Sequence, residues 1–466
     1  MGDRILGARR PPPLPWKGST PMMMRRAALV AAFTMVLAAG CSGSSSVETQ
    51  GPDAASWRDQ VKPGKLEVGV LSAKGTPGLK FLENVGAGLE KDHPGSEVTL
   101  TFANTEARPG IEQRWRAGEP PDLDYAMFDG TIPDLRAWAD DGALVDLTPY
   151  LKQEDPGTGK PWLDRYSPTV RKFMEHPETK QIYAVPSELS LHVLFYNAKM
   201  FKDLGVKPPA TWDDLLRAAD ALKAKNVDPI ALTGLFEPYM GMWSDHLWLR
   251  TVGYGKARAV LTEGNGHITD DPGFLKGLQM LQELRDKNAF LTGFKGTDFT
   301  AAQAQFFQGK AGMILMGSWL VSEMKDVIPK DFELGVLAFP KVAGAAGDQG
   351  AVMAALQNVS IASKSPDIPL ALEWVNRLTS VETQTKRANE IGEVSAVVGV
   401  PSPPGVPGID AVLSTAESLQ PREFGLGQSK AGKPVYAEIA RLLFGQQDAD
   451  ETLKRLDVAL RRVHKN

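Results

Sequence analysis

Hydrophobic and polar positions along this chain follow one another in the patterns expected of alternating strands and helices. Residues 65–71 alternate and then become continuously apolar, which predicts a first strand. Apolar residues recur every three or four positions over 78–91, which predicts a helix, and a turn at 93–95 leads into a second strand at 97–102. A strand, a helix and a strand within about forty residues predict a βαβ unit, and hence a parallel sheet covered by helices.

The same patterns continue through the rest of the chain. Further strands are predicted at 182–186, 193–196, 311–316 and 334–339. Further helices are predicted at 212–225, 274–285, 301–307, 369–379, 435–444 and 451–463. Thr211 is placed to cap the helix that follows it, and the Pro- and Gly-rich residues 398–408 predict an irregular loop. No period of about 20–50 residues recurs, so we expect an α/β fold in two lobes and not a repeat protein.

A short apolar segment near the N-terminus ends at Cys41, the only cysteine of the chain. Two arginines precede thirteen apolar or small residues at 27–39. A spanning helix needs about 20 residues, so this run is too short to cross a membrane and is typical of a secretory signal peptide. Residues 37–41 (LAAGC) are similar to a bacterial lipobox, so we expect cleavage before Cys41 and lipidation of its thiol. The alternative is that Cys41 is a buried cysteine after an apolar helix.

Loss of this segment changes the charge of the mature protein. We expect residues 1–40 to be an upstream extension and signal peptide, and residues 41–61 to be a flexible tether. Residues 1–40 carry six Lys or Arg and one Asp, so their removal takes the formal net charge from −4 to −9. Such an acidic protein is not expected to bind nucleic acid. With Cys41 acylated there are no disulfides, and over 400 residues must form large apolar cores in two or more domains.

Local signatures of common enzymes are absent from the sequence. There is no H-E-x-x-H, no G-x-S-x-G and no P-loop motif. Ser322 and Lys325 fit the S-x-x-K pattern of penicillin-binding enzymes, but no K-T-G partner motif occurs. The six histidines lack metal-ligand spacing, so neither a metal nor a cofactor is expected. A glycoside hydrolase with two catalytic carboxylates is still an alternative, because the fold, and not the spacing in the sequence, sets the distance between two such groups.

Aromatic and acidic residues follow several of the predicted strands. These residues are Glu237, Tyr239 and Trp243 in a predicted loop, Trp319 after a buried strand, and Asp129 at the end of another strand. Ligands of open α/β sheets bind beyond the carboxyl ends of the strands. Aromatic rings can stack on the C–H faces of a sugar, and carboxylates can accept hydrogen bonds from its hydroxyl groups. The pattern therefore predicts a sugar site, and the alternative is that these aromatic residues pack in the core.

Several motifs occur in an order that resembles a known family. They are Y-A-V-P at 183–186, Y-N at 196–197, P-P-A-T-W-D-D-L at 208–215, F-Q-G-K-A-G-M at 307–313 and G-S-W at 317–319. In combination they resemble the family 1 extracellular solute-binding proteins over most of residues 65–380. That family supplies the capture components of ABC importers, mostly for sugars and oligosaccharides, and many members are lipoproteins. The resemblance implies a binding protein and not an enzyme.

Closer similarity to the maltodextrin-binding members implies particular ligand contacts. The residues that match their sugar-binding positions are Lys74, Asp129, Glu237, Tyr239 and Trp319. The chain departs from them at Ala126, where they carry an aromatic residue, and at Ser190, where they carry a hinge glutamate. Glu188 is the candidate to replace that glutamate. These departures argue against maltose itself and leave a glycan ligand.

The family fold implies two lobes of the type II periplasmic-binding-protein kind, joined by three crossover hinges. Each lobe has a mixed or parallel sheet flanked by helices, and we expect lobe 1 at 62–187 with 352–378 and lobe 2 at 188–351 with 379–466. Ligand in the cleft would draw the lobes together. We expect a lipid-anchored monomer outside the cytoplasmic membrane that captures a mono- or oligosaccharide for the transmembrane subunits of an ABC permease. The alternatives are a membrane-anchored glycan-acting enzyme and a binding protein for a non-sugar ligand.

Overall fold

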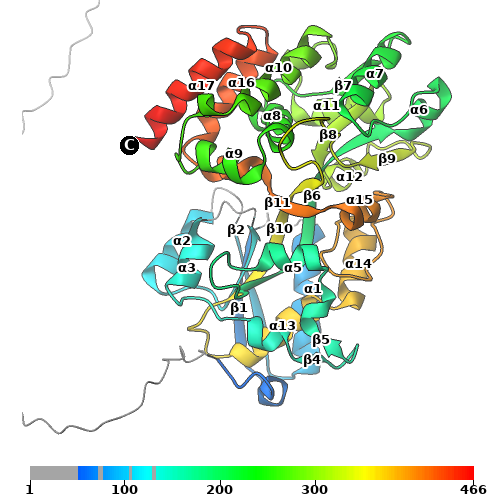
Figure 1. The fold of residues 1–466 in the computed structure, drawn as a ribbon. Coiled ribbons are helices and arrows are strands. Elements are labelled where there is room, and N and C mark those ends of the chain that lie inside the picture. Colours follow the sequence, from blue (N-terminus) through cyan, green and yellow to red (C-terminus); the bar gives the residue numbers. More distant parts are fainter. Residues whose placement is uncertain (1–50, 72–76, 104–107, 129–132, 466) are drawn as a thin grey trace, which may run out of the picture. The chain divides into compact units, whose positions relative to one another are not determined.

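A computed structural model describes residues 51–71, 77–103, 108–128 and 133–465 (Figure 1). Three of the residues named above, Cys41, Lys74 and Asp129, lie outside the described residues. Across the described ranges, no helix combines the length and the apolar character needed to span a membrane.

Every predicted helix and strand position is occupied by the predicted kind of element, and the structure adds elements that were not predicted, among them a long strand at Ala351–Ile361. The strands are β1 Lys65–Leu71, β2 Glu97–Ala103, β3 Leu123–Phe128, β4 Glu154–Asp155, β5 Lys160–Pro161, β6 Ala184–Asn197, β7 Asp228–Ala231, β8 Ala311–Gly317, β9 Leu334–Leu337, β10 Ala351–Ile361 and β11 Ser418–Pro421. The helices are α1 Pro77–Asp92, α2 Arg108–Ala117, α3 Pro133–Asp140, α4 Thr148–Leu151, α5 Pro168–Met174, α6 Ala198–Leu204, α7 Trp212–Lys223, α8 Glu237–Thr251, α9 Tyr254–Leu261, α10 Pro272–Asp286, α11 Phe299–Phe307, α12 Leu320–Met324, α13 Ile368–Leu378, α14 Val381–Ile391, α15 Ile409–Thr415, α16 Gly432–Leu443 and α17 Ala449–His464. Thr211 caps α7 through a capping box with Asp214, as predicted.

The strands other than β4 and β5 form one mixed sheet. Its order is β2-β1-β3-β10-β6-β8-β7, with β11 paired to β10 and β9 paired to β6. Strand β1 is parallel to β2 and to β3, which confirms the predicted βαβ unit. Strand β10 runs antiparallel to β3 and β6, and β6 runs antiparallel to β8 and β9. The predicted α/β class is therefore confirmed, with a sheet that is mixed.

Strand β6 joins two segments that the sequence predicts as separate strands. The fourteen-residue strand begins at Ala184, within the predicted segment 182–186, and the predicted segment 193–196 lies near its other end. Polar residues between them interrupt the apolar pattern, but they find partners inside the protein. Glu188 accepts a hydrogen bond from the guanidinium of Arg387, and the hydroxyl groups of Ser187 and Tyr125 hydrogen bond to each other. Tertiary partners of this kind leave no trace in the local hydrophobic pattern.

The prediction of a loop at 237–243 is wrong, because these residues form the first turns of helix α8. From Met240 to Thr251 every residue of this helix is buried. Hydrophobic residues therefore do not recur with a helical period, since the helix has no solvent face. Pro238 occupies the first turn, where proline is tolerated, although in the sequence it reads as a turn residue.

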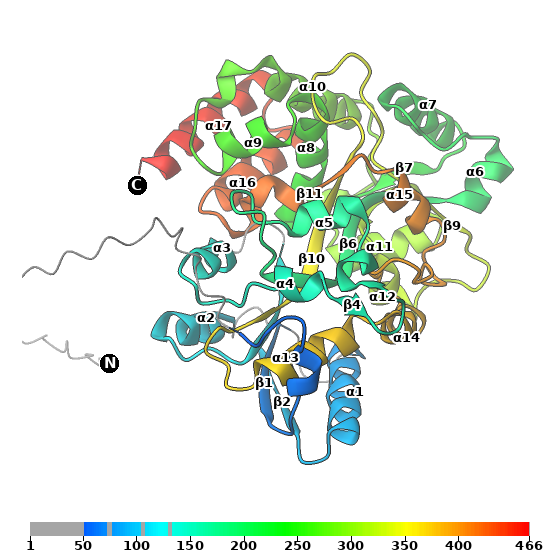
Figure 2. The ribbon, with the colours of Figure 1, turned by 60° about the horizontal axis from the view of Figure 1, so that its bottom comes forward.

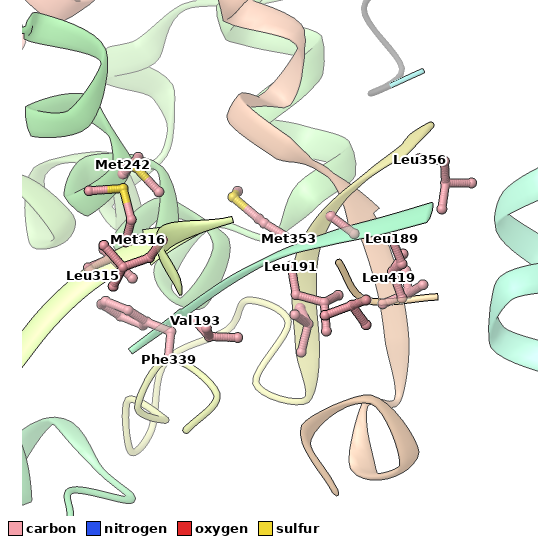
Figure 3. Packing of buried hydrophobic residues seen from close by; sticks show 14 of the residues in the cluster. Leu189, Leu191, Val193, Met242, Leu315, Met316, Phe339, Met353, Leu356 and Leu419 are labelled. Carbon is pink, nitrogen blue, oxygen red and sulfur yellow. The ribbon is translucent and has the colours of Figure 1, made fainter. Parts of the chain in front are cut away.

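Two groups of helices pack along the sheet (Figure 2). Helix α1 contacts α13 and α14, whereas α8 contacts α10 and α16, and α17 packs on α16. Figure 3 shows the apolar core between α8 and the central strands. Its labelled side chains include Leu189, Leu191, Val193, Met242, Leu315, Met316, Phe339, Met353 and Leu356, all fully or almost fully buried. Burial of each such side chain stabilises the fold by about 1.5–3 kcal/mol, which holds β6, β8 and β10 firmly in register.

Candidate ligand-binding site

Trp319 lies just beyond the end of β8, and its indole rests on Gly317. A Cβ atom added to Gly317 would lie 1.9, 2.1 and 2.2 Å from three adjacent carbons of the six-membered ring. Nearly equal distances to three adjacent ring atoms mean that Gly317 lies under the face of the ring and not at its edge. Only glycine leaves room for the indole here.

Ser318 ties this turn to strand β6. Its N–H donates to the carbonyl oxygen of Leu191 at 2.8 Å, and its Oγ accepts from the N–H of Leu191 at 3.2 Å. Leu191 is the last residue of β6 that pairs with β10, and His192 is the first that pairs with β8. Trp319 therefore lies where the central strand changes partners, the kind of position at which α/β sheets bind ligands.

Three side chains surround the indole of Trp319. The ring of His192 meets it edge-on with 5.4 Å between centroids, and the guanidinium carbon of Arg422 lies 5.9 Å from its centroid. The side chain of Tyr239 lies beside Trp319, and burial raises the pKa of this tyrosine to about 12. Burial, with a smaller effect of the Arg422 charge, lowers the pKa of His192, so the imidazole is neutral near pH 7. An apolar ring face with hydrogen-bonding groups around it suits a molecule with C–H faces and hydroxyl groups.

Arg422 belongs to a turn that the sequence does not reveal. It starts the short 3₁₀ segment Arg422–Gln428, in which Glu423, Phe424 and Gly425 have φ values of 59°, 53° and 85°. Left-handed backbone costs about 1–2 kcal/mol for each residue other than glycine. The ring of Phe424 is fully buried, and its carbonyl oxygen accepts a 2.7 Å hydrogen bond from Thr262. Tertiary packing thus holds a strained turn beside Trp319, and strain of this kind clusters at functional sites.

The start of helix α8 carries three of the predicted site residues, of which two lie at the surface and the third lies in the core. Glu237 and Tyr239 lie in the first turn and are partly exposed. Trp243 lies one turn further into the protein, fully buried, with ring centroids 5.9 Å from Phe290 and 5.8 Å from Phe339. Trp243 is therefore part of the core in this structure and has no surface on which a ligand could stack.

Glu188 is part of a buried cluster around Arg387. The guanidinium donates to Glu188 Oε2 at 2.8 Å, to Glu393 Oε2 at 2.7 Å and to the hydroxyl oxygen of Tyr125 at 2.7 Å. The β6–β10 register shifts at this point, since Glu188 lies opposite Gln357 while Pro186 lies opposite Asn358. The cluster holds β3, β6 and the segment after α14 together near the change of strand partners.

The remaining polar residues near the central strands, and the question of a metal site, can also be compared with the structure. Ala126 lies in β3 opposite Asn358, and the hydroxyl of Ser190 is 3.4 Å from Glu188 Oε1. His246 and Asp245 are both buried, with Asp245 Oδ2 accepting from the hydroxyl of Tyr436 at 3.0 Å. Among the described residues, no group of three or more His, Cys, Asp or Glu side chains could hold a metal ion.

The chain is similar in sequence to proteins named for sugar binding. It is 26% identical over 377 residues to the multiple sugar-binding protein of Streptococcus mutans, a match that covers 80% of this chain and 82% of that protein. It is 25% identical over 375 residues to a probable sugar-binding periplasmic protein of Brucella melitensis, which covers 76% and 82% of the two chains.

Solved structures share the fold over nearly their whole length. A chitin oligosaccharide binding protein is 25% identical with a TM-score of 0.68, and the match covers 86% of this chain and 99% of that one. The apo form of RafE from Streptococcus pneumoniae, at 19% identity, has a TM-score of 0.71 with 86% and 98% covered. These neighbours are two-lobed periplasmic solute-binding proteins, so the predicted two-lobed fold class is confirmed.

The seating of Trp319 on Gly317 generates a first prediction. Gly317→Ala should destabilise the protein by about 1–3 kcal/mol, because the added methyl group overlaps the indole. The same change in a Trp319→Ala background should cost much less, since the ring is absent. Urea unfolding of the four proteins measures this coupling. Additivity within about 0.5 kcal/mol would contradict the contact.

The Arg387 cluster generates a second prediction, on pH. Burial and, secondarily, the negative charge of Glu393 raise the pKa of Glu188 to about 7, above the value of about 4.5 expected in the unfolded chain. The folded protein therefore binds the extra proton between these values, so this group's contribution to stability falls as pH rises from about 4.5 to 7. Glu188→Gln should gain stability relative to the wild type across that range in urea titrations.

Glu83→Gln, at an exposed position of α1, is the matched control for the Glu188 variant and should show no such gain. A stability difference between Glu188→Gln and the wild type that stays constant from pH 4.5 to 7 would refute this assignment.

The family of this chain follows from the share of its residues that a family model matches. A family model described as bacterial extracellular solute-binding protein matches residues 72–385, about two thirds of the chain. This agrees with the motifs at 183–186, 208–215 and 307–319, and the relatives and structural neighbours are binding proteins and not enzymes. The chain belongs to the bacterial extracellular solute-binding protein family.

Proposed function

We propose that this protein captures a sugar or oligosaccharide outside the cytoplasm and delivers it to an ABC importer. The observation that carries the proposal is the seated indole of Trp319, which rests on Gly317 and has Tyr239 and Arg422 beside it. An indole face stacks on the C–H face of a pyranose, and the surrounding polar groups hydrogen bond to its hydroxyl groups. The names of the sequence relatives describe sugar binding and support the same ligand class.

The proposed site consists of residues from six parts of the chain. The ligand contacts we propose are Lys74, Asp129, Glu188, Glu237, Tyr239 and Trp319, with Arg422 added. Lys74 and Asp129 rest on the resemblance to maltodextrin-binding proteins, and Glu188 on its position near the change of strand partners. Trp243 is left out because it is fully buried.

We propose the lobe division expected from the family, with one change at the third crossover. Lobe 1 would take 62–187 and 352–397, and lobe 2 would take 188–351 and 409–466. Two observations support the change, since helix α14 packs on α1 and α13, and Val397 forms an antiparallel bridge with Tyr166. Helix α15, beyond the loop at 398–408, contacts β9. This loop would be the third hinge strand of the closure motion.

We further propose that lipidation of Cys41 anchors the mature protein to the outer face of the membrane. The signal-like segment at 27–39 and the small residues before Cys41 support this. The expected tether 41–61 is too long, because residues 57–60 form a 3₁₀ helix whose Trp57 is fully buried and stacks on Trp162. A tether at 41–50 would let the domain reach the permease. The protein would act as a monomer with the transmembrane subunits of the permease as partners.

A third prediction tests the sugar site. A thermal-shift screen with mono- and oligosaccharides should find ligands that raise the melting temperature, because a ligand that binds only the folded state stabilises it. Trp319→Ala should weaken binding of the best ligand by roughly tenfold or more without unfolding the protein. Trp319→Phe, which keeps an aromatic face, should lose less. Unchanged affinity of Trp319→Ala by calorimetry would overturn the assignment.

A fourth prediction tests the anchor. Wild-type protein should incorporate a clickable fatty acid in growing cells, and Cys41→Ala should not, because the chain has no other cysteine to acylate. A Cys41→Ala protein that still takes up the label would show that the lipid anchor is assigned to the wrong residue.

A further inference from the structure

The guanidinium of Arg250 is a buried cation that hydrogen bonds to no carboxylate among the residues that the structure describes. Arg250 lies in the last turn of α8 and is 1% exposed. Its side chain donates to four backbone carbonyl oxygens, those of Pro340 at 3.3 Å, Asp348 at 2.6 Å, Ala351 at 3.0 Å and Phe339 at 2.9 Å. A guanidinium carries five N–H groups. The two N–H groups of Nη2 share one described acceptor, so one of them is left to donate.

Neighbouring carboxylates balance this charge only in part. Burial lowers the pKa of Arg250 to about 10, and the charges of Asp348 and Glu417 oppose that effect, so the guanidinium stays charged near pH 7. Asp348 Oδ2 instead accepts from the N–H of Tyr254 at 2.7 Å. Glu417 is exposed, so water weakens the effect of its charge. A buried charge is costly unless an opposite charge pairs with it. An anion that reached Arg250 would therefore stabilise the folded protein.

Arg250 lines a groove with a volume of about 320 Å³. Small-molecule pockets typically have volumes of roughly 300–1,000 Å³. Most of the lining is apolar and includes Pro209, Leu337, Phe339, Val352, Val412 and Ala416. Ala210, Lys341 and Thr415 also line the groove and are exposed, so it is open to solvent. The groove combines an apolar wall with a buried positive charge, and none of its lining residues belongs to the proposed sugar site.

Lys341 brings a second cation to the same groove, on a segment that is held in place. The carbonyl oxygen of Lys341 accepts from the N–H of Trp212 at 2.8 Å. Within the described part of the chain, its ammonium group forms no ion pair. Gln349, further along the same loop, donates from Nε2 to the carbonyl oxygen of Arg250 at 2.7 Å. The backbone that carries both cations is therefore fixed before a ligand binds, which lowers the cost of binding.

We propose that this groove binds a small organic anion, with its charged group at Arg250 and Lys341 and its apolar part against Val412 and Ala416. The charged group, a carboxylate or a phosphate, accepts the remaining N–H of Arg250 in a charge-assisted hydrogen bond. The apolar part covers lining that a bare inorganic ion would leave in contact with water. This site is separate from sugar capture and gives the protein a second class of ligand.

Calorimetry at constant ionic strength with benzoate, phenyl phosphate, inorganic phosphate and benzyl alcohol tests the proposal. The better of the two aryl anions should bind at least roughly tenfold more tightly than benzyl alcohol, which has the ring and no charge. It should also bind roughly tenfold more tightly than inorganic phosphate, which has the charge and no ring. The comparison of benzoate with phenyl phosphate tells which charged group the groove prefers.

Four variants locate the binding of the better aryl anion. Ala416→Phe, which fills the groove from a partly exposed position, should abolish binding with a melting temperature near that of the wild type. Lys341→Gln should weaken binding by roughly threefold, because one of the two cations is lost. Glu417→Gln should strengthen binding by roughly twofold, because a competing negative charge near Arg250 is removed. Lys330→Gln, at an exposed position outside the groove, is the matched control and should bind as wild type.

Benzyl alcohol or inorganic phosphate that binds as tightly as the better aryl anion would overturn the proposal. An aryl anion whose affinity is unchanged in both Ala416→Phe and Lys341→Gln would also overturn it, because the anion then binds elsewhere. The same holds if neither aryl anion binds at millimolar concentration. In each case the proposed sugar-binding function stands, because the sugar site shares no lining residue with the groove.

Discussion

The antiparallel pairing of β6 with β10 is the interaction on which the rest of the structure depends. The two strands are fourteen and eleven residues long, and nearly every residue in them is buried. Strand β10 connects β6 to β3 and through it to β1 and β2, while β6 connects β10 to β8 and β9. A change in register here would turn the apolar side chains of the whole sheet away from their helices. The Arg387 cluster on Glu188 and Tyr125 fixes that register at its shifted point.

The position of the candidate site follows from where this pairing ends. Strand β6 leaves β10 at Leu191, and the same residue exchanges two hydrogen bonds with Ser318. Trp319 is thus attached to the central strand through its neighbour in the chain, while Gly317 supplies a flat support for the indole. The strained turn at Arg422–Gln428 and the first turn of α8 complete the surroundings. Each of these parts is anchored by buried side chains, so the aromatic surface is formed before a ligand arrives.

Much of the fold could be predicted from the sequence, because its elements are long, amphipathic and separated by turn residues. Thr211 and the helix after it are the clearest case. The failures have a common cause, which is burial on all sides. Helix α8 and the middle of β6 lack a solvent face, so their residues carry no period that a local pattern can detect.

The site was predictable only where its residues lie in short motifs. Trp319 belongs to G-S-W, and Glu237 and Tyr239 belong to E-P-Y, whereas Trp243 shares that segment and points into the core. Arg422 reaches Trp319 through a left-handed turn, and no residue pattern around it predicts that path.

A crystal structure with the sugar that raises the melting temperature most is the most direct test of the central claim. We predict a sugar ring stacked on the face of Trp319 that points away from Gly317, with hydroxyl groups within hydrogen-bonding distance of Tyr239 and Arg422. A sugar bound elsewhere on the protein, with the indole of Trp319 left uncovered, would contradict it.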